Sequence, residues 1–297
     1  MTTNPTMPGA YVLGMHRSGT SLLAGVLDRL GLDAGRQELM FKADEFNSDG
    51  YWERVDIVEW HDRALRRQGG WASAPPHPMA LADDRLAGLA DEIPRLLTPY
   101  TKPWMLKDPR QCLMLPLWHE ARGSTDLHVI SVRHPHEIQR SLQRRNSYSP
   151  ELGIALWERY VYDMLRASRG RPALLVSYEA LTTKPEATIP VIADALAATV
   201  LRNQPPDDRA ITSAISLVRP ATAPEPPPAM GAERQHLFDT LMDRLGLQAS
   251  LDFDAVAMSS DSRRVIDRRR RRLNLVGFAG RRGAVVRGRL DRLPVFR

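Results

Sequence analysis

The stretch AYVLGMHRSGTS, residues 10–21, decides the fold. It begins with an apolar run that ends in Gly14, which is typical of a short buried strand. After Ser21, apolar residues recur at helical spacing as far as Leu30, and Gly31 suits the C-terminal cap of a helix. A strand, a glycine-bracketed turn and a helix are the context that a phosphate-binding loop requires. The sequence therefore predicts an anion site at the start of this helix, where backbone N–H groups have no acceptors inside the helix.

The loop departs from the pattern G-x-x-x-x-G-K-[ST] at one position, because Thr20 stands where the lysine belongs. The cation inside the loop is Arg17, whose planar guanidinium suits two oxygens of a phosphate or a sulfate. The missing lysine disfavours a nucleotide hydrolase or a kinase, which needs that amine on the β- and γ-phosphates. A turn without a ligand is the alternative, although the loop also offers hydroxyl donors at Ser18, Thr20 and Ser21.

A second apolar run, Leu127 to Val132, predicts another strand, with Arg133 at its carboxyl end. A turn at Pro135 and a helix that carries Ser141 follow. In an open α/β sheet, ligands bind outside the carboxyl ends of the strands. Arg133 and Ser141 are therefore placed to reach one bound anion together. Taken singly, each residue is more often an ordinary surface arginine or helix serine.

Together, GMHRSGTS (14–21) and VRHPHEIQRS (132–141) resemble the sulfotransferases that use 3′-phosphoadenosine 5′-phosphosulfate (PAPS). The resemblance covers roughly residues 10–200. Further stretches that look like recurring segments of bacterial members are NSDGYWE (47–53), LKDPR (106–110), LWERY (156–160) and VSYEAL (176–181). The resemblance implies the P-loop-like sulfotransferase fold of the α/β class, with a mostly parallel central sheet flanked by helices. Strands that alternate with helices along the chain favour the same architecture.

By this resemblance, the first motif holds the 5′-phosphosulfate of PAPS and the second holds its 3′-phosphate. Arg17 then contacts the transferred sulfate, and Lys107 acts on the same group or pairs with Asp108. No metal ion is expected for the transfer. The residues that the resemblance assigns to donor binding are His16, Arg17, Ser18, Gly19, Thr20, Ser21, Arg133, Ser141 and, near the adenine, Tyr178.

Sulfuryl transfer also needs a base that takes the proton of the acceptor. Family members use a histidine or a glutamate in the loop after the first helix or soon after it. Glu53, in GYWE, matches the bacterial pattern best, ahead of Glu45 and Glu38. Glu53 also has a structural interpretation, as a carboxylate that the dipole of a helix N-terminus stabilises. His61 and His134 are the remaining alternatives.

The resemblance implies in-line transfer to a hydroxyl, less readily an amine, of a small-molecule, carbohydrate or lipid-linked acceptor. Two other functional classes stay open. A non-catalytic nucleotide-binding scaffold would keep the loop but tolerate the loss of Glu38, Glu45 and Glu53. A P-loop kinase for a small molecule would need ATP and magnesium, for which the loop lacks its lysine.

Length and composition set further bounds. The 297 residues suffice for one large α/β domain. The single cysteine, Cys112, excludes an internal disulfide and suits a small core residue. No apolar run reaches eighteen residues, and the first ten residues lack the pattern of a secretory signal. We therefore expect a cytoplasmic protein with a disordered N-terminus over 1–9 and a sulfotransferase domain over 10–250. That domain includes a Pro-rich loop over 203–232 and a helix over 81–97.

Positive charge is concentrated at the C-terminus. From Arg263 onward, thirteen arginines face two aspartates, a net charge of +11, whereas the rest of the chain has 28 basic and 33 acidic residues. This predicts an Arg-rich tail over 251–297 that is either solvated or an amphipathic anchor on an anionic membrane. Nucleic acid is not expected as a partner, because no base-reading motif accompanies the charge.

Overall fold

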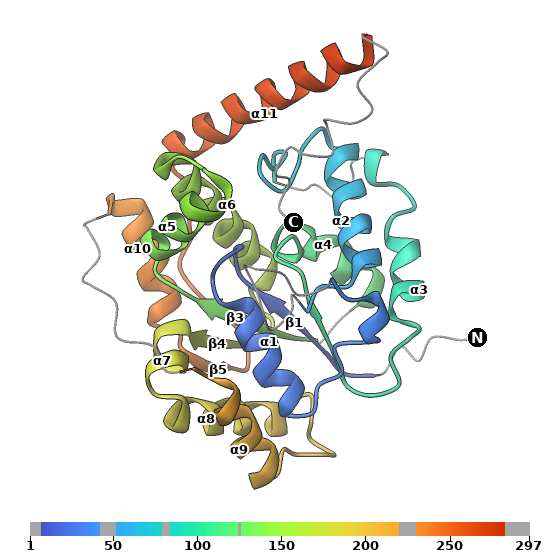
Figure 1. Cartoon of the computed structure of the whole chain (residues 1–297), viewed down its shortest axis with the longest axis vertical. Helices are drawn as coiled ribbons and strands as arrows, with labels where there is room; N and C mark the ends of the chain where they lie inside the picture. Colours follow the sequence, from blue (N-terminus) through green and yellow to red (C-terminus); the bar gives the residue numbers. More distant parts are fainter. Residues whose placement is uncertain (1–6, 42–51, 79–83, 124–125, 220–229, 283–297) are drawn as a thin grey trace.

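The computed structural model describes residues 7–41, 52–78, 84–123, 126–219 and 230–282. In these ranges the sheet has five strands, in the order β2-β1-β3-β4-β5 (Figure 1). The first four strands are parallel to one another, and β5 pairs antiparallel with β4. The mostly parallel α/β sheet that the sequence predicts is confirmed. The strands are β1 (Gly9–Leu13), β2 (Trp104–Lys107), β3 (Leu127–Val132), β4 (Ala173–Ser177) and β5 (Gly246–Gln248).

Helices cover both faces of the sheet (Figure 1). Alternate residues of β1 point to the two faces, so Ala10 and Val12 join one buried cluster and Tyr11 and Leu13 join the other. The first cluster includes residues of α1 (Thr20–Arg29), α7 (Tyr178–Thr183), α8 (Pro185–Ala198) and α9 (Asp208–Leu217). The second includes residues of α2 (Val55–Arg67), α3 (Ile93–Leu97), α4 (Gln111–Arg122), α5 (Pro135–Asn146), α6 (Pro150–Ser168), α10 (Ala232–Met242) and α11 (Ser260–Arg282).

Local capping fixes where α5 and α6 begin. Pro135 stands in the first turn of α5, where its missing N–H costs nothing, and the ring of His134 accepts a 3.3 Å hydrogen bond from the N–H of His136. Ser149 caps α6 by accepting a 3.3 Å hydrogen bond from the N–H of Leu152. Only Arg133 and His134 separate the carboxyl end of β3 from the start of α5.

The prediction of a single helix over 81–97 is wrong. Its described part contains two 3-10 segments, Asp84–Leu86 and Ala90–Glu92, followed by the five-residue α3. Gly88 interrupts the run at φ +74°, a left-handed conformation that ends helices. Pro94 in the first turn of α3 lacks the N–H that one continuous helix would use.

The prediction of a Pro-rich loop over 203–232 is also wrong in part, because this segment contains the helix α9. The carboxylate of Asp207 caps this helix by accepting a 2.8 Å hydrogen bond from the N–H of Ala210. Pro205 and Pro206 precede the cap, so neither interrupts the helical hydrogen bonds. Ala214 is fully buried in the same cluster as α1.

The Arg-rich tail predicted over 251–297 starts with residues that pack on the core. Leu251, Phe253 and Met258 are buried, and α11 lies against α6 with Ile266 only 2% exposed. Val265 and Ile266 of α11 therefore pack against the core on the α6 side. The domain boundary at residue 250 stays a prediction.

A histidine pair links α4 to β3, with His128 fully buried and His119 half-buried. Nε2 of His119 lies 3.1 Å from Nε2 of His128, and Nδ1 of His128 lies 2.7 Å from the hydroxyl of Ser168. Burial lowers the pKa of His119 to about 3 and lowers the pKa of His128 well below its ordinary value. Both rings therefore stay neutral in the folded protein under mildly acidic conditions, whereas the unfolded chain takes up these protons below pH ~6.5.

We expect this pair to make stability depend on pH. Below pH ~6.5 the unfolded state binds more protons than the folded state. The stabilisation of the folded state by the neutral pair is therefore complete above that pH. It is lost as the pH falls toward the lowered folded pKa, at up to about 1.4 kcal/mol per pH unit for each histidine. The free energy of unfolding is measured with urea at about pH 7 and at about pH 5. Between these pH values it should fall by roughly 1–2 kcal/mol less in His119→Gln than in the unmodified protein. His236→Gln, at an exposed position on α10, is the control. Equal losses in all three proteins would rule out the neutral pair.

Candidate active site

The loop between β1 and α1 has the backbone shape of an anion-binding turn. Arg17 adopts φ +70° and Gly19 adopts φ +94°, so two left-handed residues curl the chain before Thr20 begins the helix. Gly19 occupies the N-cap position and offers no side chain to the first helical amides. A Cβ at Gly19 would lie 2.1 Å from the ring of Tyr178, so the close approach of α7 requires glycine here.

Arg17, Ser141 and Arg133 come together at the carboxyl edge of the sheet. Nε of Arg17 donates a 2.8 Å hydrogen bond to the hydroxyl of Ser141, although the two residues are 124 positions apart. A terminal nitrogen of Arg133 donates a 3.0 Å hydrogen bond to the carbonyl oxygen of Arg17. The two sequence motifs, one after β1 and one after β3, therefore form one site because these strands are neighbours in the sheet.

Tyr178 adds an aromatic wall to this site. The guanidinium of Arg133 lies 4.2 Å from the centroid of the Tyr178 ring, a cation–π geometry that holds both groups. Glu137 accepts a 2.9 Å hydrogen bond from Nε of Arg133 and orients the same guanidinium from the other side. Arg133 is thus held beside the loop by a ring, a carboxylate and a backbone carbonyl.

Lys107, at the end of β2, brings an ammonium to the loop from a neighbouring strand. Its Nζ donates to the hydroxyl of Ser21 at 3.1 Å and to Oε1 of Glu53 at 2.5 Å. The Lys107 side chain is 3% exposed and that of Glu53 is 13% exposed, so this ion pair is largely shielded from solvent. The cation that a Walker loop carries at the position of Thr20 is therefore replaced by one from β2, next to the start of α1.

Asp108, the alternative partner of Lys107, belongs to a buried network beneath the cleft. Its Oδ2 lies 2.6 Å from Nδ1 of His61, and Arg110 donates to its Oδ1 at 3.1 Å. Burial alone would raise the pKa of Asp108, but the charge of Arg110 and the hydrogen bond from His61 outweigh it and hold that pKa well below its usual range. Nε of Arg110 also donates to Asp62 at 2.7 Å. The network fixes the chain directly after Lys107.

The two histidines considered as bases are both engaged elsewhere. His61 is fully buried, and its Nε2 accepts a 3.0 Å hydrogen bond from the indole N–H of Trp118. Nδ1 of His61 therefore carries the proton that is shared with Asp108, which leaves no ring nitrogen for an acceptor. His134 caps α5 and packs edge-on against Phe238. Neither ring is among the described residues that line the cleft.

The three candidate glutamates have different positions. Glu53 lines the cleft next to the loop. Glu38 is exposed on the 3-10 segment Gln37–Leu39 and is not brought to the described cleft wall. Glu45 lies outside the described residues. The structure therefore brings Glu53, and not Glu38, to the loop.

His16 and Cys112 support the loop from below. His16 is 8% exposed, and burial together with the charges of Arg110 and Lys107 lowers its pKa well below the ordinary value. The Cys112 sulfur accepts a 3.2 Å hydrogen bond from the N–H of Gly14, and burial raises the pKa of its thiol to about 12. The thiol thus stays protonated, which suits the core position that the sequence predicts.

The cleft at this edge has a volume of about 190 Å³. Arg145, on α5, is a cleft residue that the sequence reasoning missed. It follows Ser141 by four positions, so both residues lie on one face of the helix, and this spacing was the available signal. The described residues that line the cleft are His16, Arg17, Gly19, Thr20, Ser21, Leu22, Glu53, Lys107, Pro109, Arg133, Arg145 and Tyr178.

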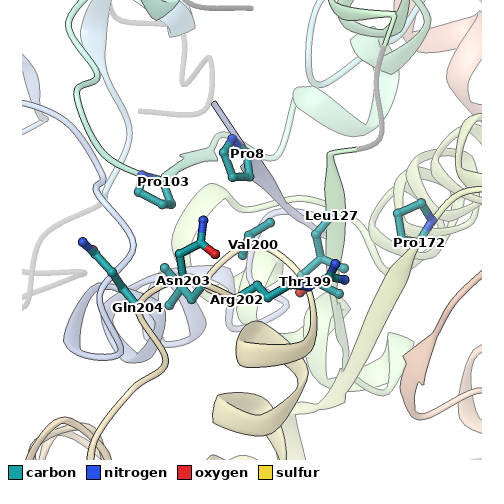
Figure 2. Close-up of a pocket in the computed structure, with 10 residues that line it drawn as sticks. Pro8, Pro103, Leu127, Pro172, Thr199, Val200, Arg202, Asn203 and Gln204 are labelled. Carbon is teal, nitrogen blue, oxygen red and sulfur yellow. The ribbon is translucent and has the colours of Figure 1, made fainter. Parts of the chain in front are cut away.

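A larger cavity, of about 700 Å³, lies at the opposite edge of the sheet (Figure 2). Pro8, Pro103 and Pro172 line it where they precede β1, β2 and β4, and the segment 199–204 after α8 forms another part of its wall. Arg202 is the charged residue among its described lining residues, and it donates to the carbonyl oxygen of Ala198 at 3.0 Å. Without a cluster of charged donors, this cavity does not match the anion chemistry that the smaller cleft offers.

No group of three or more histidine, cysteine, aspartate or glutamate side chains among the described residues could hold a metal ion. None of the helices in the described ranges combines the length and the apolar composition needed to cross a bilayer.

A parallel sheet with a phosphate-type loop after its first strand, and a second arginine at the end of the adjacent strand, defines a P-loop-like α/β protein. A family model described as "Sulfotransferase family" matches residues 8–200, which is more than half of the chain. The chain belongs to the sulfotransferase family.

Two solved structures are similar to this chain. The "Sulfotransferase Domain from the Curacin Biosynthetic Pathway" is 13% identical with a TM-score of 0.40, and the alignment covers 88% of this chain and 97% of that one. The "Sulfotransferase Domain from the Synechococcus PCC 7002 Olefin Synthase" is 18% identical with a TM-score of 0.41, and the alignment covers 90% and 95% of the two chains. A comparison with curated proteins found no match.

Proposed function

We propose that the protein is a PAPS-dependent sulfotransferase that moves a sulfuryl group to a hydroxyl, less readily an amine, of a small acceptor, a carbohydrate or a lipid-linked group. The family supports the transfer of sulfuryl groups. The observation that carries the choice of donor is the convergence of Arg17, Ser141 and Arg133 at one edge of the sheet. Two separate arginine centres beside one loop suit a nucleotide with two separate anionic groups.

The loop residues fit a phosphosulfate group. The first-turn amides of α1 have no acceptors inside the helix, and the helix dipole favours an anion there. The hydroxyl of Ser18 is buried and has no hydrogen-bond partner among the described residues. Ser18 is not among the described residues that line the cleft, so the fit of the loop rests on its backbone amides and on Arg17. Arg17 adds a guanidinium that is already oriented by Ser141.

The residues after β3 fit the 3′-phosphate. Arg133 offers a guanidinium that its ring and carboxylate partners hold in place, and Ser141 offers a hydroxyl from α5. The Tyr178 ring borders the same cleft and is suited to lie against a purine. ATP lacks a 3′-phosphate, so this second centre favours an adenosine 3′,5′-bisphosphate over ATP.

PAPS, when bound, supplies an activated sulfuryl group, whose bond to the 5′-phosphate oxygen breaks as the acceptor oxygen bonds to sulfur. In this proposal Glu53 takes the acceptor proton, which is supported by its position in the cleft and by its contact with Lys107, the residue that also donates to Ser21 of the loop. Lys107 neutralises Glu53 before the acceptor arrives and offers positive charge beside Ser21. Arg17 offers positive charge on the loop itself. Both cations stabilise oxygen charge that develops during the transfer.

Calorimetric titration tests the donor assignment. We expect adenosine 3′,5′-bisphosphate to bind more tightly than adenosine 5′-monophosphate and ATP, without magnesium. In Arg133→Ala, the affinity for the bisphosphate relative to the monophosphate should fall about tenfold to a hundredfold. This is the loss expected when one or two hydrogen bonds to a charged group are removed. Arg140→Ala, at an exposed position on the same helix as Ser141, is the control and should bind like the unmodified protein. Equal affinity for the monophosphate, or magnesium-dependent preference for ATP, would falsify the assignment.

A further inference from the structure

The basic helix α11 is fixed on the domain by a buried carboxylate. Glu158 of α6 is 1% exposed and accepts hydrogen bonds from the hydroxyls of Ser259 and Ser262, at 2.9 Å and 2.6 Å, and from Nε of Arg234 at 3.0 Å. Ser259 and Ser262 stand at the start of α11, so the carboxylate anchors that end of the helix. The start of α11 is therefore fixed on the core.

The other part of α11 reaches the chain that follows α2. Arg270 donates a 3.2 Å hydrogen bond to the carbonyl oxygen of Pro75 and a 2.7 Å hydrogen bond to Asp267. Figure 1 shows α11 passing over the end of α6 toward α2. The helix is therefore held at two places.

A cavity of about 360 Å³ separates α11 from the first turn of α6. Three arginines of α11 border it, together with the capping residue of α6. Its described lining residues are Ser149, Glu151, Leu152, Val265, Arg268, Arg269, Arg272 and Leu273. The cavity is therefore basic on one side and bounded by a helix N-terminus on the other.

Among the described residues, the positive charges around this cavity exceed the negative ones. Arg268 and Arg272 have no hydrogen bond or ion pair to another residue in the described ranges, and four positions on one helix separate these like charges. Arg269 lies 4.7 Å over the ring of Tyr148, and its Nε has no hydrogen-bond partner in the same ranges. Against these three guanidiniums the lining contributes a single carboxylate, that of exposed Glu151. A bound anion would relieve the repulsion and accept hydrogen bonds from the guanidiniums of Arg268 and Arg272.

The cavity lies close to the catalytic cleft along the chain. Arg145 lines the cleft, Tyr148 stacks under Arg269, and Ser149 lines the cavity. The four steps from Arg145 to Ser149 span at most about 14 Å, even in a fully extended chain. Arg145 of the cleft and Ser149 of the cavity therefore lie within about the length of one small molecule.

We propose that this cavity is an anion subsite, which binds a phosphate, sulfate or carboxylate group that the acceptor carries in addition to the hydroxyl to be sulfated. The assignment to the acceptor rests on the proposed function, since the donor phosphates have their own centres at Arg17 and Arg133. The substrate class is thus a hydroxyl compound with an anionic group, and Arg268, Arg269 and Arg272 select it.

Phosphate titration of three full-length proteins tests this subsite. They are the unmodified protein, the cavity variant Arg268→Gln/Arg272→Gln, and the control Arg263→Gln/Arg271→Gln. The control changes two exposed arginines of the same helix that do not border the cavity, so both variants lose the same charge. Inorganic phosphate is titrated after adenosine 3′,5′-bisphosphate has saturated the donor cleft. Phosphatidylglycerol vesicles, with phosphatidylcholine vesicles as reference, form a second arm.

We expect phosphate to bind the unmodified protein and the control alike, and about tenfold or more weakly to the cavity variant. Affinity for the bisphosphate should be the same in all three proteins. Equal weakening in both variants, or no phosphate binding to the unmodified protein, would overturn the subsite. Vesicle binding lost only in the cavity variant, without binding of free phosphate, would overturn it too, in favour of a membrane contact.

The same experiment separates this inference from the proposed function. If the bisphosphate binds none of the three proteins, the donor assignment fails. The phosphate titrations then proceed on Arg17→Ala backgrounds, which remove the loop arginine as a competing phosphate site. Dependence of phosphate binding on Arg268 and Arg272 in these backgrounds still establishes the cavity as an anion site, and independence refutes it.

Discussion

Glu53→Gln is expected to lower the turnover of sulfuryl transfer by about 10²- to 10⁴-fold, the usual loss when a general base is removed. Glutamine keeps the shape of the side chain but cannot accept the acceptor proton. The loss should appear in kcat, because Glu53 acts on the acceptor and not on the donor nucleotide. Release of adenosine 3′,5′-bisphosphate from PAPS, followed by chromatography, measures it.

Two comparisons make the Glu53 result decisive. Glu38→Gln makes the same chemical change at an exposed site away from the described cleft wall, so it should leave turnover within about twofold. Binding of the bisphosphate to Glu53→Gln should stay near the unmodified value, which shows that loss of the Lys107 ion pair has not disturbed the loop. Unchanged turnover in Glu53→Gln would remove Glu53 from the role of base.

Arg17→Ala is expected to weaken binding of the bisphosphate by roughly a hundredfold or more. Its guanidinium is the charged side chain that the loop itself provides, and hydrogen bonds to charged groups contribute about 1.5–3 kcal/mol each. The substitution also frees the hydroxyl of Ser141, which Arg17 contacts at 2.8 Å, so the second motif is affected as well. Calorimetry gives the affinity directly.

Arg144→Ala is the matched control for Arg17→Ala. Arg144 is exposed on the last turn of α5, beside the cleft residue Arg145, and the change removes the same charge. If the two variants bind the bisphosphate equally, Arg17 contributes only to the overall positive potential. A Tm that falls strongly in Arg17→Ala alone would instead point to a folding role for the residue.

The parts of the site that could be predicted from the sequence depend on local pattern. The run 10–21 specifies a strand, a turn and a helix within twelve residues, so it places Arg17 and Gly19 without knowledge of the rest of the fold. The run 127–141 does the same for Arg133 and Ser141. The two runs meet because β1 and β3 are neighbours, which is the usual place for a ligand in an open parallel sheet.

The parts that could not be predicted depend on contacts between distant residues. Glu53 and Lys107 are 54 positions apart, and only the approach of β2 to the chain before α2 brings them together. The sequence left Lys107 with two possible partners for the same reason. Asp108 is instead held by His61, 47 positions away, a pairing that no spacing reveals.

Composition was misleading where a few core residues decide the structure. Five consecutive arginines, 268–272, are typical of a solvated segment, but Ile266 and the Glu158 carboxylate place this helix on α6. Prolines likewise predicted a loop around α9, although a single capping aspartate, Asp207, is enough to start a helix after them. In both cases one specific contact outweighs the average character of the segment.

A crystal structure of the complex with adenosine 3′,5′-bisphosphate tests the central claim most directly. We predict that its 5′-phosphate lies within hydrogen-bond distance of the loop 16–21 and that its 3′-phosphate lies against Arg133 and Ser141. The adenine is then expected beside Tyr178. A nucleotide bound in the cavity at the opposite edge of the sheet, or one whose 3′-phosphate makes no contact with Arg133, would contradict the account.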